Sequence, residues 1–143
     1  MNVGIDTDFL VRLNIKEHND HASTIEMRDR ILDAGDRFAL APQVLAEFVH
    51  VVTDPRRFER PLSMDDALLR ASDFWNAAEV IQTLPSAGAV AGFFDLMRVH
   101  NLGRKRILDT LLAATYIASG VKHLLTGNPS DYRIFKDLVL LEL

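Results

Sequence analysis

The sequence predicts an α/β domain built on a parallel sheet with helices on both faces, and two observations lead to it. Short apolar runs of strand length alternate along the 143 residues with longer segments whose apolar residues recur at helical spacing. Parallel strands need helical crossovers between them, and the covering helices keep such strands apolar along their whole length. There is no internal repeat, low-complexity stretch or long linker, so one domain over residues 1–143 is expected.

Five short runs are expected to form the strands. They are residues 2–5, 37–40, 79–83, 121–126 and 138–141. The first run is bounded by Asp6, and the second follows a Gly35-Asp36 turn. Ligands of parallel sheets bind beyond the carboxyl ends of the strands, at the point where strand order reverses. Acids that follow a strand are therefore the first candidates for chemistry.

Helical spacing predicts the elements between these strands. They are residues 7–15, 20–34, 42–53, 63–77, 86–101 and 104–119. Pro42 suits the first turn of its helix, Ser63 with Asp66 resembles a capping box, and Gly120 is a candidate C-cap. Residues 54–61, which contain two prolines and three arginines, and the polar stretch 127–131 are expected to be loops.

The composition excludes several classes of protein. With 48% apolar and 25% charged residues the chain is an ordinary globule, and with no cysteine it has neither a disulfide framework nor a thiolate zinc site. It has no signal-peptide pattern and no run of roughly 18 apolar residues, so a cytoplasmic location is expected. The net charge of −4 argues mildly against a general nucleic-acid binder. Bound cations would remove part of that objection.

Two acids follow predicted strands. Asp6 stands at the end of the first strand and Asp131 lies in the loop that leaves the fourth, so both carboxylates meet at one crevice if these strands flank the switch point. Each also has a structural interpretation. Asp6 is a good N-cap for the helix that starts at Thr7, and Asp131 could be a turn residue after Asn128-Pro129.

Two further acids lie beside apolar helical stripes. At roughly 100° per residue, Glu47 falls outside one edge of the stripe of its helix, and Asp109 falls outside a stripe that includes Leu108 and Leu112. An acid in such a place tends to be partly shielded from water and needs a partner. No Lys or Arg lies three or four residues from Glu47, whereas Asp109 has two upstream cations and could form a plain ion pair. A surface acid without function remains an alternative for each.

Taken together, the four acids indicate a metal-dependent site. Mg²⁺ and Mn²⁺ prefer carboxylate oxygens and water, and a pair of such ions activates a water and stabilises the leaving oxygen in phosphodiester cleavage. No other constellation competes, because the five histidines lack an HExxH spacing and the chain has no G-x-S-x-G elbow, P-loop or G-x-G-x-x-G.

Three segments resemble the PIN-domain family. GIDTDFLVRL resembles the opening of PIN domains, and APQVLAEFVHVV resembles the segment with their second acid. The most specific match is RILDTLLAATYIASGVKHLLTGNPSDYRIF, in which an Asp starts an apolar helix, a Gly and a strand follow, and T-x-N-x-x-D precedes an aromatic residue. The order and spacing agree over nearly the whole chain, and the resemblance is greatest to toxins of VapC-type toxin–antitoxin pairs.

The resemblance implies a three-layer α/β/α fold whose five-stranded parallel sheet has the order 3-2-1-4-5. It implies a Mg²⁺- or Mn²⁺-dependent ribonuclease that cleaves RNA with a metal-activated water, forms a homodimer and is blocked by a cognate antitoxin. The family's acidic positions, catalytic and metal-binding, correspond to Asp6, Glu47, Asp109 and Asp131.

Other residues near these acids receive supporting roles. The resemblance places Thr7, Thr126 and Asn128 at polar positions that support the acids. Asp8 departs from the family, which more often has Asn or Ser there, and its role stays open between supporting the metal site and facing solvent.

Three consecutive cations precede Asp109 along the chain. Arg104, Lys105 and Arg106 lie near a helix N-terminus, where cations oppose the dipole, so they are candidates for contact with RNA. A solvated basic run that pairs with Asp109 is the alternative.

Two other functions remain to be weighed. A catalytically silent PIN-like module that only binds a protein partner would not need all four acids. A phosphoacceptor receiver domain would need a paired acid beside the first strand and a lysine after the fifth, and no lysine follows Lys136.

Overall fold

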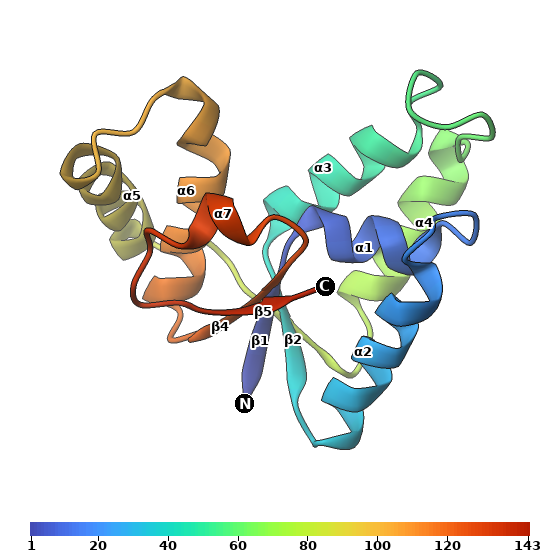
Figure 1. Ribbon diagram of the computed structural model, residues 1–143, viewed down its shortest axis with the longest axis horizontal. Coiled ribbons are helices and arrows are strands. Elements are labelled where there is room, and N and C mark those ends of the chain that lie inside the picture. The colour runs from blue at the N-terminus through green and yellow to red at the C-terminus, as the bar shows by residue number, and fades with distance from the viewer.

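The computed structural model describes residues 1–143, and a five-stranded sheet forms its centre (Figure 1). The strands are β1 (Asn2–Ile5), β2 (Arg37–Leu40), β3 (Val80–Gln82), β4 (His123–Thr126) and β5 (Val139–Glu142). Their order is β3-β2-β1-β4-β5, and every neighbouring pair is parallel. The predicted fold class and strand order are therefore confirmed.

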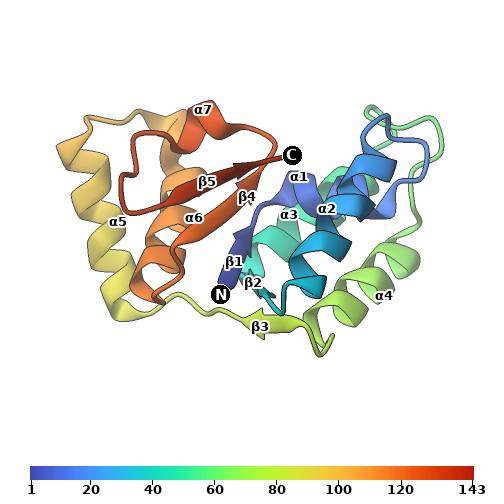
Figure 2. The same cartoon turned by 60° about the horizontal axis from the view of Figure 1, so that its bottom comes forward.

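Helices cover both faces of this sheet. They are α1 (Thr7–Asn14), α2 (His21–Asp33), α3 (Pro42–Val52), α4 (Met64–Trp75), α5 (Ala87–Val99), the 3₁₀ turn η1 (Arg104–Arg106), α6 (Ile107–Ala118) and α7 (Pro129–Tyr132). The helices α1 to α4 lie on one face, and α5 and α6 lie on the other (Figures 1 and 2). Right-handed crossovers require this division, because the chain moves across the sheet in one direction from β1 to β3 and in the opposite direction from β3 to β4, through α5 and α6. Strand order therefore reverses between β1 and β4.

The central strand β1 packs closely against α6. Val3 and Ile5 have no exposed surface, and a Cβ atom at Gly4 would lie 2.9 Å from ring carbons of Tyr116. The Tyr116 hydroxyl donates a 2.6 Å hydrogen bond to the backbone carbonyl of Ile5. Glycine at position 4 thus lets the tyrosine ring cross the strand and fixes α6 over the end of β1.

The predicted helix ends are largely confirmed by their caps. The Ser63 hydroxyl accepts a hydrogen bond from the backbone N–H of Asp66 at 3.1 Å, as a capping residue does. Gly120 has a φ of +76°, and the N–H of Val121 donates to the Tyr116 carbonyl at 3.0 Å, which closes the end of α6.

Two local predictions are wrong. Residues 127–131 are not wholly a loop, because Asn128-Pro129 starts the one-turn helix α7, which contains Asp131. The helix predicted over 104–119 begins as the 3₁₀ turn η1 before α6. Both differences lie at the carboxyl edge of the sheet, where contacts between distant segments decide the backbone and local periodicity does not.

The apolar stripe predicted for α6 is also wrong at its first turn. Leu108 is 67% exposed and Ile107 is 39% exposed, whereas Thr110, Ala113 and Tyr116 form the buried face with Leu112. The sheet ends before the first turn of α6, so no layer lies beneath Ile107 and Leu108. This turn carries Asp109 beyond the strands. No helix of the chain is both long and apolar enough to cross a membrane.

Candidate functional site

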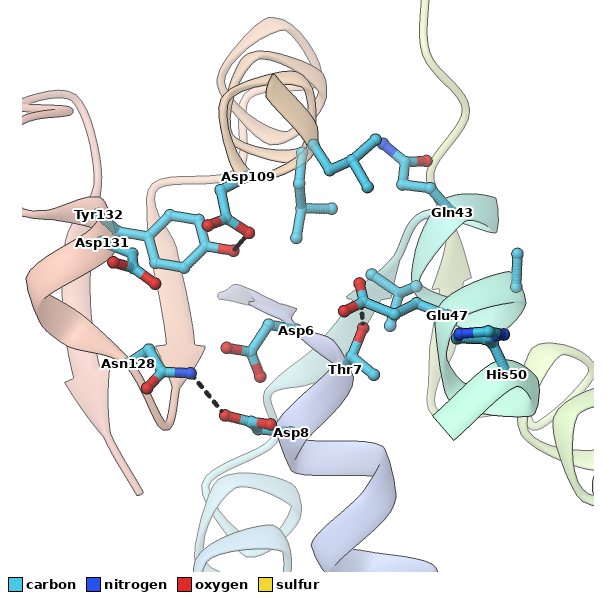
Figure 3. A pocket seen from close by; sticks show the side chains of 14 residues that line it. Asp6, Thr7, Asp8, Gln43, Glu47, His50, Asp109, Asn128, Asp131 and Tyr132 are labelled. Carbon is cyan, nitrogen blue, oxygen red and sulfur yellow. Dashed lines mark hydrogen bonds between the residues drawn. The ribbon is translucent and has the colours of Figure 1, made fainter. Parts of the chain in front are cut away.

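A pocket of about 360 Å³ lies beyond the carboxyl ends of β1 and β4, where strand order reverses. Five of its lining residues are acids: Asp6, Asp8, Glu47, Asp109 and Asp131. Asp6 immediately precedes α1 and Asp8 lies in its first turn. Glu47 comes from α3, Asp109 from α6 and Asp131 from α7, and the five side chains face a common space (Figure 3). No lysine or arginine lines this pocket. The fold thus brings together all four acids that the sequence singled out, and Asp8 with them.

Asp6 forms the floor of the pocket and is 6% exposed. Its Oδ1 accepts a hydrogen bond from the backbone N–H of Phe9 at 3.2 Å, and its Oδ2 accepts one from the Thr126 hydroxyl at 2.5 Å. The capping interpretation is therefore confirmed for Asp6, and the same carboxylate also lines the pocket. Burial is the main cause that raises the pKa of Asp6, and the charge of Asp8 adds to it; against the opposing effect of hydrogen bonds from Thr126 and the backbone, the pKa reaches about 6.

Glu47 lies on the wall formed by α3. The hydroxyl of Thr7, the first residue of α1, donates a 2.9 Å hydrogen bond to Glu47 Oε2. Glu47 is exposed, so the expectation of partial shielding from water is wrong for it. The edge of α3 that carries Glu47 faces the open pocket, and no other element covers it. The side chain of Thr7, which the resemblance predicts to support the acids, thus contacts Glu47.

Asp109 lies opposite Glu47 and is half-buried. The hydroxyl of Tyr132 donates a 3.2 Å hydrogen bond to Asp109 Oδ1. Burial is the main cause that raises the pKa of Asp109, and the charges of Asp131 and Glu47 add to it. Asp109 forms no ion pair with the cations before it, so that alternative is not realised.

Asp8 and Asn128 meet at the rim of the pocket. The side-chain amide of Asn128 donates a 2.9 Å hydrogen bond to Asp8 Oδ2 (Figure 3). The backbone N–H of Asn128 donates to the Thr126 hydroxyl at 2.9 Å. This linkage ties the loop after β4 to the start of α1. A Cβ atom at Gly127 would lie 2.7 Å from Arg12 Nη2 and 2.8 Å from Asp8 Oδ2, so a larger residue there would displace the ends of both side chains.

The three cations before Asp109 differ in what they contact. Arg104 and Lys105 are exposed and do not line the pocket. Arg106 is half-buried, and its guanidinium donates to the backbone carbonyl of Asp131. Arg106 therefore contacts the backbone of the segment that carries Asp131, whereas the sequence analysis had grouped it with its exposed neighbours.

Sequence reasoning missed several residues of the pocket. Tyr132 is the most informative, since it was noted only as an aromatic residue after Asp131. The hydroxyl of Tyr132 was the signal in the sequence that could have indicated its contact with an acid, because a phenol near several carboxylates has hydrogen-bond acceptors within reach. Gln43 and His50 of α3 also line the pocket and carry no signal in the sequence beyond their polarity.

The donor set was tested against the divalent cation that the resemblance implies. All the acids offer carboxylate oxygens, the type of ligand that Mg²⁺ and Mn²⁺ prefer, and no lysine or arginine among the lining residues balances their charge. No three of the acids lie close enough to enclose one ion by themselves. Mg²⁺ usually keeps several waters and binds one or two carboxylates directly, so the residues present fit such an ion.

Comparison with protein families decides the affiliation of the chain. Residues 3–136 match the family described as PIN domain. The chain belongs to the PIN-domain family. Over 86 residues it is 31% identical to a VapC ribonuclease of Mycobacterium bovis and to ribonuclease VapC43 of Mycobacterium tuberculosis. Each match covers 58% of this chain. The chain spans about half the length of these curated relatives, since the match covers 52% of each.

Solved structures share the fold of this PIN domain at low sequence identity. VapBC2 from Rickettsia felis, bound to a DNA fragment from its promoter, is 19% identical with a TM-score of 0.66 and covers 100% of this chain and 99% of its own. VapC20 of Mycobacterium tuberculosis, a toxin that cleaves the sarcin-ricin loop, is 15% identical with a TM-score of 0.65. The match covers 90% of this chain and 92% of VapC20. VapBC-1 from nontypeable Haemophilus influenzae is 15% identical with a TM-score of 0.67. The match covers 99% of this chain and 98% of that chain.

Proposed function

We propose that residues 1–143 act as a single PIN domain with divalent-metal-dependent ribonuclease activity, and that water is the nucleophile in cleavage of the RNA phosphodiester bond. The observation that carries this proposal is one pocket with five carboxylates and no lysine or arginine. The names of the similar proteins, VapC ribonucleases, support RNA as the substrate.

The cation is held by Asp6, Glu47, Asp109 and Asp131 in this proposal, directly or through water. When bound, Mg²⁺ or Mn²⁺ lowers the pKa of a water and stabilises negative charge on the leaving oxygen. The residues that bond to the acids orient them. Thr126 holds Asp6, and Thr7 holds Glu47, so each carboxylate keeps its direction while the pocket is open to solvent. Asp8 is held by Asn128 and adds negative charge at the rim.

Contact with RNA outside the pocket falls to Arg104 and Lys105. Both are exposed on η1, immediately before the helix that carries Asp109. Cations in this place attract phosphates toward the acids and offset part of the net charge of −4. Arg106 is the least accessible of the three candidates, because it is half-buried and its guanidinium donates to the Asp131 carbonyl.

The biological role proposed for the chain is that of a toxin, inhibited by a cognate antitoxin in the cytoplasm. Support comes from the similar folds of VapC20, which is described as a toxin, and of a toxin–antitoxin complex from Klebsiella pneumoniae. A homodimer is part of this proposal, and exposed apolar side chains on α5 and at the first turn of α6 offer a surface for it. They are Val90, Phe94, Val99, Ile107 and Leu108.

Incubation of the purified protein with total RNA tests the nuclease. Cleavage should require Mn²⁺ or Mg²⁺, stop in excess EDTA, and leave 5′-phosphate and 3′-hydroxyl ends, because water attacks the phosphorus in line. Cleavage that persists in EDTA, or 2′,3′-cyclic phosphate products, would contradict the mechanism. No cleavage of any RNA with metal present would favour the silent interaction module.

Expression in bacteria tests the role of toxin separately. The unmodified chain should slow growth, and Asp109→Asn should not. Equal growth with both proteins soluble would count against the toxin while leaving the nuclease standing. Co-purification of a small protein that restores growth would identify the antitoxin.

A further inference from the structure

We propose that Tyr132 is a positioning residue whose hydroxyl fixes the Asp109 carboxylate for binding of the divalent cation. The inference rests on the proposed function and assigns to the site a residue beyond its acids. Figure 3 shows the Tyr132 ring reaching from α7 toward Asp109, on the side of the pocket that also carries Asp131.

Three of the five acids of the pocket share a pattern of support. Thr7 bonds to Oε2 of Glu47, Asn128 bonds to Oδ2 of Asp8, and Tyr132 bonds to Oδ1 of Asp109. In each pair one carboxylate oxygen is held by a neutral donor, and the other oxygen accepts no hydrogen bond from the protein. An oxygen that is free while its partner is held can face a cation without a change of rotamer. Tyr132 thus does for Asp109 what Thr7 does for Glu47.

The hydroxyl of Tyr132 has this one partner. Tyr132 is 3% exposed, and its ring lies 6.3 Å from that of Phe135 between centroids. A phenylalanine would fill the same space, and a buried hydroxyl is unfavourable unless it is hydrogen-bonded. The ordinary pKa of a phenol is about 10, so the hydroxyl of Tyr132 keeps its proton and remains a donor at neutral pH.

A second bond holds α7 in place for this contact. The guanidinium of Arg106, just before α6, donates to the backbone carbonyl of Asp131, the residue before Tyr132. Two bonds therefore join the start of α6 to α7. Since Asp109 and Asp131 lie on these two elements, the bonds set the spacing of the two carboxylates on this side of the pocket.

The test compares Tyr132→Phe with Tyr116→Phe in a Mn²⁺ titration followed by electron paramagnetic resonance. Tyr116 is a matched control, because it is equally buried and its hydroxyl donates to a backbone carbonyl. Loss of an outer-shell partner typically weakens metal affinity, so Tyr132→Phe should raise the dissociation constant for Mn²⁺ about 10-fold. Tyr116→Phe should leave that constant unchanged while lowering the melting temperature.

Each outcome decides a different point. Equal Mn²⁺ affinity of Tyr132→Phe and the unmodified chain, or equal losses in both variants, would overturn the inference. No Mn²⁺ binding by the unmodified chain would overturn the proposed function as well. Tight Mn²⁺ binding that depends on Tyr132, without cleavage of RNA, would overturn the nuclease alone.

A second measurement does not depend on the folding of Tyr132→Phe. The chain has two tyrosines, so in Tyr116→Phe the remaining tyrosine signal comes from Tyr132. Ultraviolet resonance Raman spectra of this protein should show a phenol that donates a hydrogen bond. The added substitution Asp109→Asn should weaken that signature, and an unchanged spectrum would show that the hydroxyl has another partner.

Discussion

The hydroxyl of Thr126 donates a 2.5 Å hydrogen bond to Oδ2 of Asp6, across 120 positions of sequence. Thr126 is the last residue of β4 and Asp6 follows β1, so the bond spans the two strands between which strand order reverses. Both residues are buried, and the bond opposes the rise that burial causes in the pKa of Asp6. The floor of the acidic pocket is therefore fixed by a contact between the two halves of the sheet.

The first prediction concerns the pH dependence of stability without metal. Because the pKa of Asp6 is about 6 in the folded chain against 3.8 ordinarily, the folded state keeps a proton that the unfolded chain has lost between those pH values. The free energy of unfolding should therefore fall as pH rises through this window and stay low above it. A shift of this size corresponds to about 3 kcal/mol.

Asp6→Asn should remove that part of the pH dependence. At pH 7.5 in EDTA the variant should be more stable than the unmodified chain by about 1–2 kcal/mol, because an amide avoids the buried charge but cannot accept both hydrogen bonds of the carboxylate. Thermal melts of both proteins from pH 4 to pH 8 provide the measurement. Parallel stability curves would show that Asp6 is not the group responsible.

Thr126→Val should destabilise the protein more at pH 8 than at pH 5. The variant leaves the charged Asp6 without its hydroxyl donor, at a cost of about 1–3 kcal/mol where the carboxylate is ionised. Thr24→Val is the control, since this buried hydroxyl donates to the carbonyl of Asp20 and no titratable group is its partner. The control should lose similar stability at both pH values. A pH-independent loss in Thr126→Val would contradict the role of this hydroxyl.

Loss of single acids should abolish cleavage without loss of the fold. Asp6→Asn, Glu47→Gln and Asp109→Asn should each lower the rate of RNA cleavage by several orders of magnitude, because each removes a carboxylate proposed to hold the cation. Asp73→Asn, an exposed acid of α4 outside the pocket, should cleave as the unmodified chain does. Near-native activity of any of the three at saturating Mn²⁺ would remove that residue from the set of ligands.

Mn²⁺ should stabilise the folded chain before any substrate is added. A cation that binds only the native state adds about 2.7 kcal/mol at a hundredfold excess over its dissociation constant, which corresponds to several degrees of melting temperature. Asp109→Asn should shrink this increase. If the acids act as scattered surface charges, the melting curve will not respond to Mn²⁺ in either protein.

The three cations of η1 should have two different roles, contact with RNA for Arg104 and Lys105 and stability of the fold for Arg106. Arg104→Ala and Lys105→Ala should raise the KM for RNA and reduce the dependence of binding on salt, with no change in melting temperature, because both side chains are exposed. Arg106→Ala should lower the melting temperature, because it removes the bond to the Asp131 carbonyl. Salt-dependent binding and thermal melts distinguish the two groups. Equal behaviour of all three variants would show that η1 acts as one solvated basic run.

The sequence by itself determined the layers of the fold and where acids gather. Apolar runs that alternate with helical stripes require parallel strands with crossovers, and the carboxyl ends of such strands share one edge. Asp6 and Asp131 could therefore be placed at this edge from chain order. Glu47 and Asp109 could be placed beside it only as acids flanking apolar stripes, because periodicity fixes the direction of a side chain around its own helix and not the element that it faces.

Tertiary structure alone decided how the acids are held and which apolar residues are buried. The bonds from Thr126 to Asp6 and from Tyr132 to Asp109 join residues far apart in sequence, and no local pattern encodes their distance. Leu108 matches the helical pattern yet is 67% exposed, because the sheet ends before the first turn of α6. The pattern of apolar residues indicates which side chains can be buried. Burial also requires a neighbouring helix or sheet to pack against, and the position of that neighbour is decided only when the whole chain has folded.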